Sequence, residues 1–152
     1  MTADEEYMTV CIELAKKAAE KGECPVGAVV VNKDGEILGR GYNMRETLQS
    51  PTAHAEILAI EQAAKALGSW RLTDCTLYVT LEPCPMCTGA IINSRIKRLV
   101  YGASDYKAGS CGSVIDLFSL PYNHKPEVAK GVMQEECAAL LSDFFKKLRK
   151  KL

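Results

Sequence analysis

The sequence lacks several features that would assign the protein to a specialised class. It contains no run of roughly eighteen apolar residues, so no transmembrane helix is expected. Residues 1–6 are mostly polar and acidic and are not followed by an apolar segment, which excludes an ordinary secretory signal. The 19 basic residues balance the 19 acidic ones, so the overall charge gives no indication of a polyanionic partner.

The cysteines also lack the patterns of a disulfide-bonded protein and of a zinc ribbon. The seven cysteines are odd in number and irregularly spaced, which argues against a disulfide framework and favours a reducing, cytoplasmic location. Most lie among apolar neighbours, as Cys11 does beside Ile12, and are interpreted as small buried hydrophobic residues. Only one C-x-x-C motif is present, whereas a zinc ribbon needs two.

The composition is that of an ordinary globular protein, with 47% hydrophobic and 25% charged residues. A chain of 152 residues can bury one substantial core, so we expect a single domain spanning residues 1–152. The hydrophobic periodicity predicts helices over residues 2–22, 52–68, 84–94 and 135–151, with one helical turn within 114–120. It predicts strands over residues 28–31, 37–42, 76–81, 99–101 and 127–132. This order indicates a mixed sheet of about five strands with helices on both faces.

Three local expectations follow from the same pattern. Thr2 and Glu5 form a capping-box pair at the start of the first helix. Thr52 is expected to cap the second helix, with a core stripe formed by Ile57, Ile60, Ala64 and Leu67. Phe144 and Leu148 are expected to fix the last helix to the core, while the cations from Lys146 to Lys151 stay exposed. Residues 43–51 and 103–113 are interpreted as loops.

The residues with the strongest chemical signal are His54, Glu56, Cys84 and Cys87. An imidazole and two thiols are three metal ligands, and three protein ligands with an open position are typical of a catalytic zinc. Cys84 and Cys87 lie at the first turn of a predicted helix, whose positive end favours thiolates. His54 and Glu56 would point about 200° apart along a regular helix. They can converge only if His54 lies at or before the first turn.

Other interpretations of these residues remain open. A C-x-x-C motif in a cytosolic protein can be a thioredoxin-like redox pair. A histidine on a helix is more often structural than a ligand, although Glu56, Cys84 and Cys87 shift His54 towards a functional role. His124, the other histidine, follows a loop at Pro121 and is interpreted as substrate-facing or structural.

The chain resembles a known family at these residues. His54-Ala55-Glu56 and Pro83-Cys84-Pro85-Met86-Cys87 match the H-x-E and P-C-x-x-C motifs of the zinc deaminases. The chain thereby resembles cytidine deaminase-like proteins of three-layer α/β/α fold, and more narrowly the bacterial tRNA-specific adenosine deaminases. The narrower resemblance covers nearly the whole chain, including the residues Gly41-Tyr42-Asn43 and 136–145.

The resemblance implies a hydrolytic enzyme that converts adenosine to inosine at the wobble position of an arginine tRNA anticodon. It implies one zinc ion per chain, bound by His54, Cys84 and Cys87, and no organic cofactor. Glu56 would act as the proton shuttle for a zinc-activated water. By analogy, Asn43 and the Ala55 backbone hold the base. The resemblance further implies binding of the tRNA anticodon stem-loop, a homodimer and no membrane association.

Asp105 and Asn123 lie in loops that the resemblance places near the flanking nucleotides. For these two residues, and for Asn43, turn formation is the competing interpretation. Two further functions also remain open. A free nucleobase or nucleoside deaminase of the same fold, acting on guanine or cytosine, would share every zinc residue. A non-catalytic, zinc-stabilised binding module would not need the unligated carboxylate of Glu56.

Overall fold

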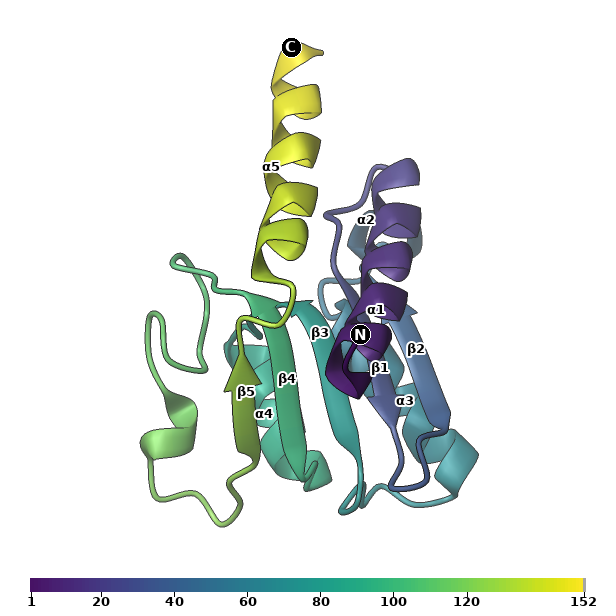
Figure 1. Ribbon diagram of the computed structural model, residues 1–152, viewed down its shortest axis with the longest axis vertical. Coiled ribbons are helices and arrows are strands. Elements are labelled where there is room, and N and C mark those ends of the chain that lie inside the picture. The colour runs from purple at the N-terminus through teal and green to yellow at the C-terminus, as the bar shows by residue number, and fades with distance from the viewer. Residues whose placement is uncertain (152) are drawn as a thin grey trace.

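A computed structural model describes residues 1–151, which form a five-stranded sheet with helices on both sides (Figure 1). The helices are α1 (Ala3–Glu20), α2 (Arg45–Leu48), α3 (Ala55–Leu67), α4 (Pro85–Ser94) and α5 (Gln134–Lys150), with a 3₁₀ turn η1 (Leu117–Ser119). The strands are β1 (Gly27–Val31), β2 (Ile37–Tyr42), β3 (Thr76–Leu81), β4 (Arg98–Ala103) and β5 (Glu127–Lys130). The predicted three-layer α/β/α fold is confirmed.

The strand order across the sheet is β2-β1-β3-β4-β5. Strand β1 runs antiparallel to both β2 and β3, whereas β3, β4 and β5 run parallel to one another. Because β3 and β4 are parallel, the chain leaves both strands at the same edge of the sheet. In open α/β sheets, ligand-binding and catalytic sites lie at this edge, beyond the carboxyl ends of the strands.

The alternation of side chains along β1 builds the two halves of the core. Ala28 and Val30 pack into the cluster beneath α3 and α4, while Val29 and Val31 pack into the cluster beneath α1 and α5. All five residues of β1 are buried, which explains why this strand reads as a continuous apolar run. The capping box of Thr2 and Glu5 at the start of α1 is also confirmed.

The predicted core stripe of α3 is wrong for most of its residues, and of the four only Ile60 packs, half-buried, against the core. The buried residues of this helix are Ala55, Glu56, Ala59 and Ala63, whereas Leu67 is 48% exposed. The reason lies in β2, where Gly39 and Gly41 let the helix backbone approach the strand. A Cβ atom added at Gly41 would lie 2.3 Å from the Ala55 carbonyl oxygen. Small residues therefore lie closest to the sheet, and the larger side chains of the helix are at most half-buried.

The loop predicted over residues 43–51 contains the short helix α2. Its start is held by a distant carboxylate, because Glu23 accepts hydrogen bonds from the backbone N–H groups of Glu46 (3.1 Å) and Thr47 (2.6 Å). The Thr47 hydroxyl donates to the same carboxylate at 2.7 Å. A helix of one turn that depends on a partner more than twenty residues away leaves no periodic signal in its own sequence.

Helix α5 joins the core through Cys137 and Leu140 near its start, and the helix extends beyond the edge of the sheet (Figure 1). Cys137 is buried and Phe144 is half-buried, but Leu148 is 47% exposed. The expectation that Leu148 fixes the helix to the core is therefore wrong. Over residues 1–151, none of the helices combines the length and apolar character of a membrane-spanning segment.

Candidate metal centre and active site

The three predicted ligands lie at the starts of two helices. His54 is the N-cap residue of α3 and has extended backbone angles (φ −80°, ψ 151°). Cys84 is the N-cap residue of α4, with Pro85 as the first helical residue and Cys87 in the first turn. The expectation that His54 precedes the helical turns is confirmed. The cap expected from Thr52 is wrong, since His54 occupies that position.

A side chain from outside α3 satisfies its first N–H group. The amide oxygen of Asn43 accepts a hydrogen bond from the Ala55 N–H at 2.8 Å, and Asn43 is buried. Asn43 directly follows β2, so this bond ties the start of α3 to the end of that strand. The backbone beside His54 is thereby fixed without a cap from the helix's own sequence.

The ligand atoms have the spacing that a tetrahedral metal needs. The Sγ atoms of Cys84 and Cys87 each lie 3.6 Å from His54 Nδ1, and the three atoms lie within 4.8 Å of one another. Zinc bonds are about 2.3 Å to sulfur and about 2.0–2.1 Å to nitrogen. At a tetrahedral angle, they would separate a ligand nitrogen from a ligand sulfur by about 3.6 Å. One nitrogen and two sulfurs also suit zinc chemically, so the residues fit this metal.

Hydrogen bonds within the group favour loss of a proton from one of the two thiols, Cys84. The Cys87 thiol hydrogen-bonds to Cys84 and, together with His54, lowers the pKa of Cys84 to about 4. The same interaction raises the pKa of Cys87, because one proton is shared between two close sulfurs. The hydrogen bond to Cys84 raises the pKa of His54. The hydrogen bonds therefore favour a thiolate at Cys84, and a bound cation would favour one at Cys87 as well.

Glu56 lies next to the ligands but outside the three-residue group. Its side chain is 4% exposed, and burial raises the pKa of its carboxyl to about 7, because a buried carboxylate loses its hydration. Since His54 precedes the first turn and Glu56 lies within it, the 200° separation expected on a regular helix does not apply. An unligated carboxyl that titrates near neutral pH can both accept and return a proton.

The structure places the predicted substrate-binding residues in different environments. Asn43 and Ala55 are buried and bonded to each other, as described above. Asp105 forms a turn, because its carboxylate accepts hydrogen bonds from the N–H groups of Lys107 (3.0 Å) and Ala108 (3.3 Å). Asn123 is exposed in the segment between η1 and β5.

One residue near the site has no counterpart among the sequence predictions. Glu82, two positions before Cys84, is only 2% exposed and binds the loop over residues 105–113. Its carboxylate accepts hydrogen bonds from the N–H groups of Asp105 (3.0 Å), Cys111 (3.0 Å) and Ser113 (3.1 Å), and from the Ser113 hydroxyl. Burial alone would raise the pKa of Glu82, but these hydrogen bonds outweigh it and the pKa is lowered. The sequence signal that could have indicated Glu82 was a carboxylate at the end of an apolar strand, directly before Pro83.

A three-layer α/β/α fold with a His/Cys/Cys group at two helix starts defines the cytidine deaminase-like class of hydrolytic enzymes. Comparison with protein families matches residues 2–149 to the MafB19-like deaminases. The chain is 55% identical to the tRNA-specific adenosine deaminase of Bacillus subtilis, over 99% of this chain and 94% of the relative. It is 53% identical to the enzyme of the same name from Haemophilus influenzae, over 96% of this chain and 85% of the relative.

A solved structure from a study of A-to-I editing by tRNA:A34 deaminases at the wobble position of transfer RNA superposes with a TM-score of 0.87. Its sequence is 44% identical, and the match covers 90% of this chain and 99% of that one. The chain therefore belongs to the MafB19-like deaminase family and, within it, to the group of tRNA-specific adenosine deaminases.

Proposed function

We propose that residues 1–152 act as a single zinc-dependent domain that hydrolyses adenosine to inosine at the wobble position of a tRNA anticodon, in an arginine tRNA. The observation that carries this proposal is the 55% identity to a tRNA-specific adenosine deaminase along almost the full length of both chains. The His/Cys/Cys group with a buried carboxyl beside it supports deamination as the reaction.

In this proposal His54, Cys84 and Cys87 hold one zinc ion through Nδ1 and two Sγ atoms. Zinc with three protein ligands supplies a water molecule whose pKa is lowered towards neutrality. The low pKa of Cys84 supports this role, since the metal ligand must be a thiolate. The two helix starts add partial positive charge that stabilises thiolates in the same place.

Glu56 is the proton carrier of the proposed reaction. Its carboxylate accepts a proton from the attacking water, which adds its oxygen to C6 of the adenine ring. Glu56 delivers this proton to N1, and it then transfers the remaining proton of the new C6 hydroxyl to the amino group, which leaves as ammonia while C6 becomes a carbonyl. A group used in both directions needs a pKa near the working pH, and burial brings the pKa of Glu56 to about 7.

Asn43 and the Ala55 backbone are proposed to hold the flipped adenine beside Glu56. The Asn43 oxygen already accepts from the Ala55 N–H, so its amide NH₂ is the group that can donate to the base. The loop that contains Asp105 is proposed to contact the flanking nucleotides, with Glu82 fixing its shape. Asn123 is proposed to do so from the segment before β5.

We also propose that the enzyme is a cytoplasmic homodimer. On α4, Ile91 and Ile92 are buried, while Met86, Gly89 and Ala90 are only half-buried, which leaves an apolar strip along the helix. A second copy of the chain would cover this strip.

The function can be tested by mass spectrometry of the products. The purified protein is incubated with an unmodified tRNA pool and, separately, with free guanine, adenine and cytosine. The proposal expects inosine at the wobble position of an arginine tRNA and no turnover of the free bases. Deamination of a free base with unchanged tRNA would instead identify a nucleobase deaminase of the same fold.

A further inference from the structure

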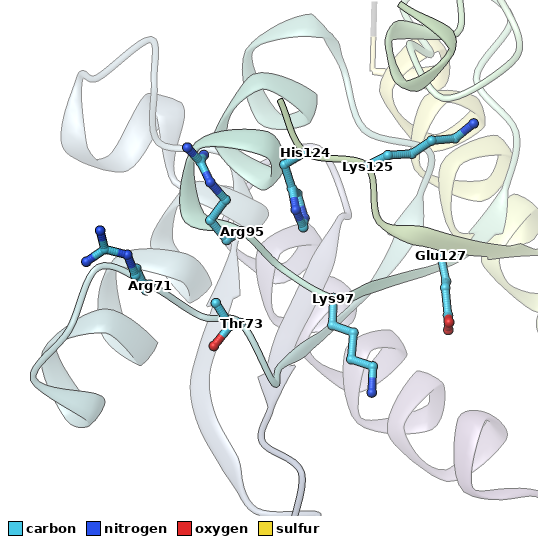
Figure 2. Close-up of a pocket in the computed structure, with 7 residues that line it drawn as sticks. All are labelled: Arg71, Thr73, Arg95, Lys97, His124, Lys125 and Glu127. Atoms are coloured by element: carbon cyan, nitrogen blue, oxygen red, sulfur yellow. The ribbon is translucent and has the colours of Figure 1, made fainter. Parts of the chain in front are cut away.

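A basic hollow of about 470 Å³ lies on the molecule away from the metal centre. Seven residues line it: Arg71, Thr73, Arg95, Lys97, His124, Lys125 and Glu127. Figure 2 shows Arg71 and Arg95 on one side and Lys97 and Lys125 on the other, with Thr73 and His124 between them. Four cationic side chains thus line one hollow with a single carboxylate, in a chain whose net charge is zero.

The topology separates this hollow from the metal centre. Its residues come from three segments that lead into or begin β3, β4 and β5, which are parallel strands. The hollow therefore lies at the amino ends of these strands, whereas Cys84 and Cys87 follow the carboxyl end of β3. The six residues of β3 span about 20 Å, so one ligand group cannot occupy both places.

The cations of the hollow have no carboxylate partner among the residues that the structure describes. Over residues 1–151, one ion pair is formed, between Arg98 and Asp4, and neither belongs to the hollow. The guanidinium groups of Arg71 and Arg95 lie 4.3 Å and 5.8 Å from the ring centroid of Trp70. An aromatic ring holds a guanidinium in place without neutralising it, as a carboxylate would. Arg95 is further fixed by a hydrogen bond to the Ile92 carbonyl at 2.7 Å.

A hydrogen bond also holds the histidine of the hollow in place. His124 Nε2 lies 2.7 Å from the Ile96 carbonyl oxygen, which can only accept, so this nitrogen carries a proton and donates. This bond ties the segment before β5 to the segment before β4. Unpaired guanidinium and ammonium groups around a fixed, solvent-open hollow are suited to phosphate, which accepts charge-assisted hydrogen bonds from both.

We propose that this hollow is a phosphate-binding site separate from the metal centre. The phosphate can belong to the backbone of the RNA substrate or to a free phosphate compound, and the chemistry is the same for both. If it belongs to the RNA, the site binds phosphates several nucleotides away from the reacting base, because the two edges are about 20 Å apart. That binding would position the RNA without reading its sequence.

Trp70 gives a direct readout, because it is the only tryptophan of the chain and is 53% exposed beside Arg71 and Arg95. The protein is titrated with pyrophosphate and, separately, with an anticodon stem-loop RNA that lacks the target adenosine, and the fluorescence of Trp70 is measured. Both titrations are done at constant ionic strength. Binding is measured without any reaction, so failure of this proposal is distinct from failure of the proposed deamination.

The test variant is Lys97→Gln with Lys125→Gln, since both side chains are exposed and their replacement leaves the packing intact. The matched control is Lys17→Gln with Lys33→Gln, which removes the same charge from α1 and from the β1–β2 turn. The test variant should bind about tenfold more weakly or worse, because each charge-assisted hydrogen bond is worth a factor of about ten. For RNA, the log–log salt slope should also fall by roughly 0.7 to 0.9 for each phosphate that the variant no longer binds.

A saturable fluorescence change with RNA alone assigns the site to the substrate backbone, and one with pyrophosphate assigns it to a free phosphate compound. Either result supports the proposal if the test variant, and not the control, is weakened. The proposal is overturned if neither ligand changes Trp70 fluorescence. It is also overturned if the test and control variants bind equally well.

Discussion

The metal group depends on which residue begins each helix. Successive residues of an α-helix are rotated by about 100°, so a helix α3 that began before His54 would turn its imidazole away from Glu56. The hydrogen bond from the Ala55 N–H to Asn43 holds the helix start one residue after His54. Pro85 has the corresponding role in α4, because proline is suited to the first helical position and leaves Cys84 as the cap.

Replacing Glu56 should remove catalytic turnover, whereas replacing Cys84 should remove the metal. Glu56→Gln is expected to retain one zinc per chain and the fold, but to lower kcat by about two to four orders of magnitude, the typical contribution of a general acid–base group. Cys84→Ser is expected to lose the metal and some stability with it. Elemental analysis and inosine formation measure both effects. Cys75→Ser, which removes a thiol outside the group, serves as the control and should keep its zinc. Near-normal turnover in Glu56→Gln would remove this residue from the mechanism.

Glu82 should contribute stability that depends on pH. Its folded pKa lies below its ordinary value of 4.5, so its contribution is present above that pH and is lost as the pH falls through the folded pKa. Glu82→Gln should lower the free energy of unfolding by on the order of 3 kcal/mol at pH 7, because four buried or part-buried donors lose a charged acceptor.

Urea unfolding from pH 7 down to pH 3 measures this contribution. The difference between the parent and Glu82→Gln should shrink as the pH falls below about 4.5. Glu61→Gln, an exposed carboxylate on α3, is the control and should have little effect. A constant difference at every pH would show that the charge of Glu82 is not what stabilises the loop.

Among the elements, β2 and α3 have the tightest packing. A Cβ atom at Gly39 would lie 2.1 Å from the Ala59 carbonyl oxygen, and one at Gly41 would lie 2.3 Å from that of Ala55. Both contacts are with helix backbone, which cannot move away as a flexible side chain can. Because Ala55 directly follows His54, the packing of this helix also sets the position of a proposed metal ligand.

Gly41→Ala is therefore expected to weaken metal binding as well as stability. Overpacking against backbone should lower the free energy of unfolding by about 1–3 kcal/mol. Zinc affinity, measured by competition with a chelator, should fall because α3 must shift at its first turn. Gly22→Ala is the control: its positive φ also makes alanine unfavourable, by about 1–2 kcal/mol, but no atom lies within 4 Å of the added Cβ. The control should lose stability and keep its zinc affinity, so equal affinity in both variants would contradict the argument.

The elements that the sequence predicted correctly are those with a local or periodic signal. The predicted ranges of β2 and β3 agree with the structure, and the 3₁₀ turn η1 lies within the predicted segment. Helix α3 was predicted in the right place, but its fully buried residues are not the predicted ones. Its isoleucines are only half-buried and Leu67 is exposed, because the glycines of β2 favour alanine on the inner face. Which side chains a helix buries depends on the strand it meets, and the sequence of the helix alone does not contain that information.

The metal group could be predicted because its motifs specify both residue types and spacing. The arrangement of Cys84 and Cys87 follows from a helix start, which proline marks in the sequence. The roles of Glu23 and Glu82 could not be predicted, since each carboxylate binds backbone groups more than twenty residues away. The basic hollow could not be predicted for the same reason, because its cations come from three separate segments.

At the scale of the whole molecule, the apolar strip on α4 predicts a dimer. Light scattering at micromolar concentration should give twice the mass of one chain. Replacing the half-buried Met86 with Glu should produce monomers, since a charge in an apolar interface is unfavourable. The exposed Asn93→Glu on the same helix is a control for added charge alone. A monomeric parent with full activity would contradict the dimer.

The distribution of charge leads to the last prediction. With a net charge of zero, RNA must be bound through local cations, and the projecting end of α5 carries the densest set: Lys146, Lys147, Arg149, Lys150 and Lys151. Lys147 and Lys151 also line a groove of about 670 Å³ between α5 and α1, together with Lys16. Because this end of the helix projects from the sheet, its cations are exposed to a large ligand (Figure 1).

Replacing Lys147, Arg149, Lys150 and Lys151 with Gln should weaken tRNA binding and reduce its salt dependence by roughly 0.7 to 0.9 in log–log slope for each phosphate that is no longer bound. Turnover at saturating tRNA should change little, because these groups bind the ground state and the transition state alike. KM and kcat for inosine formation, measured between 50 and 200 mM salt (roughly the range over which phosphate contacts dominate), separate the two effects. If the basic hollow binds the same RNA, combining these four changes with Lys97→Gln and Lys125→Gln should add their free energies, since the two clusters share no partner. An unchanged KM and salt slope in the four-residue variant would show that the end of α5 is only a solvated helix terminus whose cations complement the helix dipole.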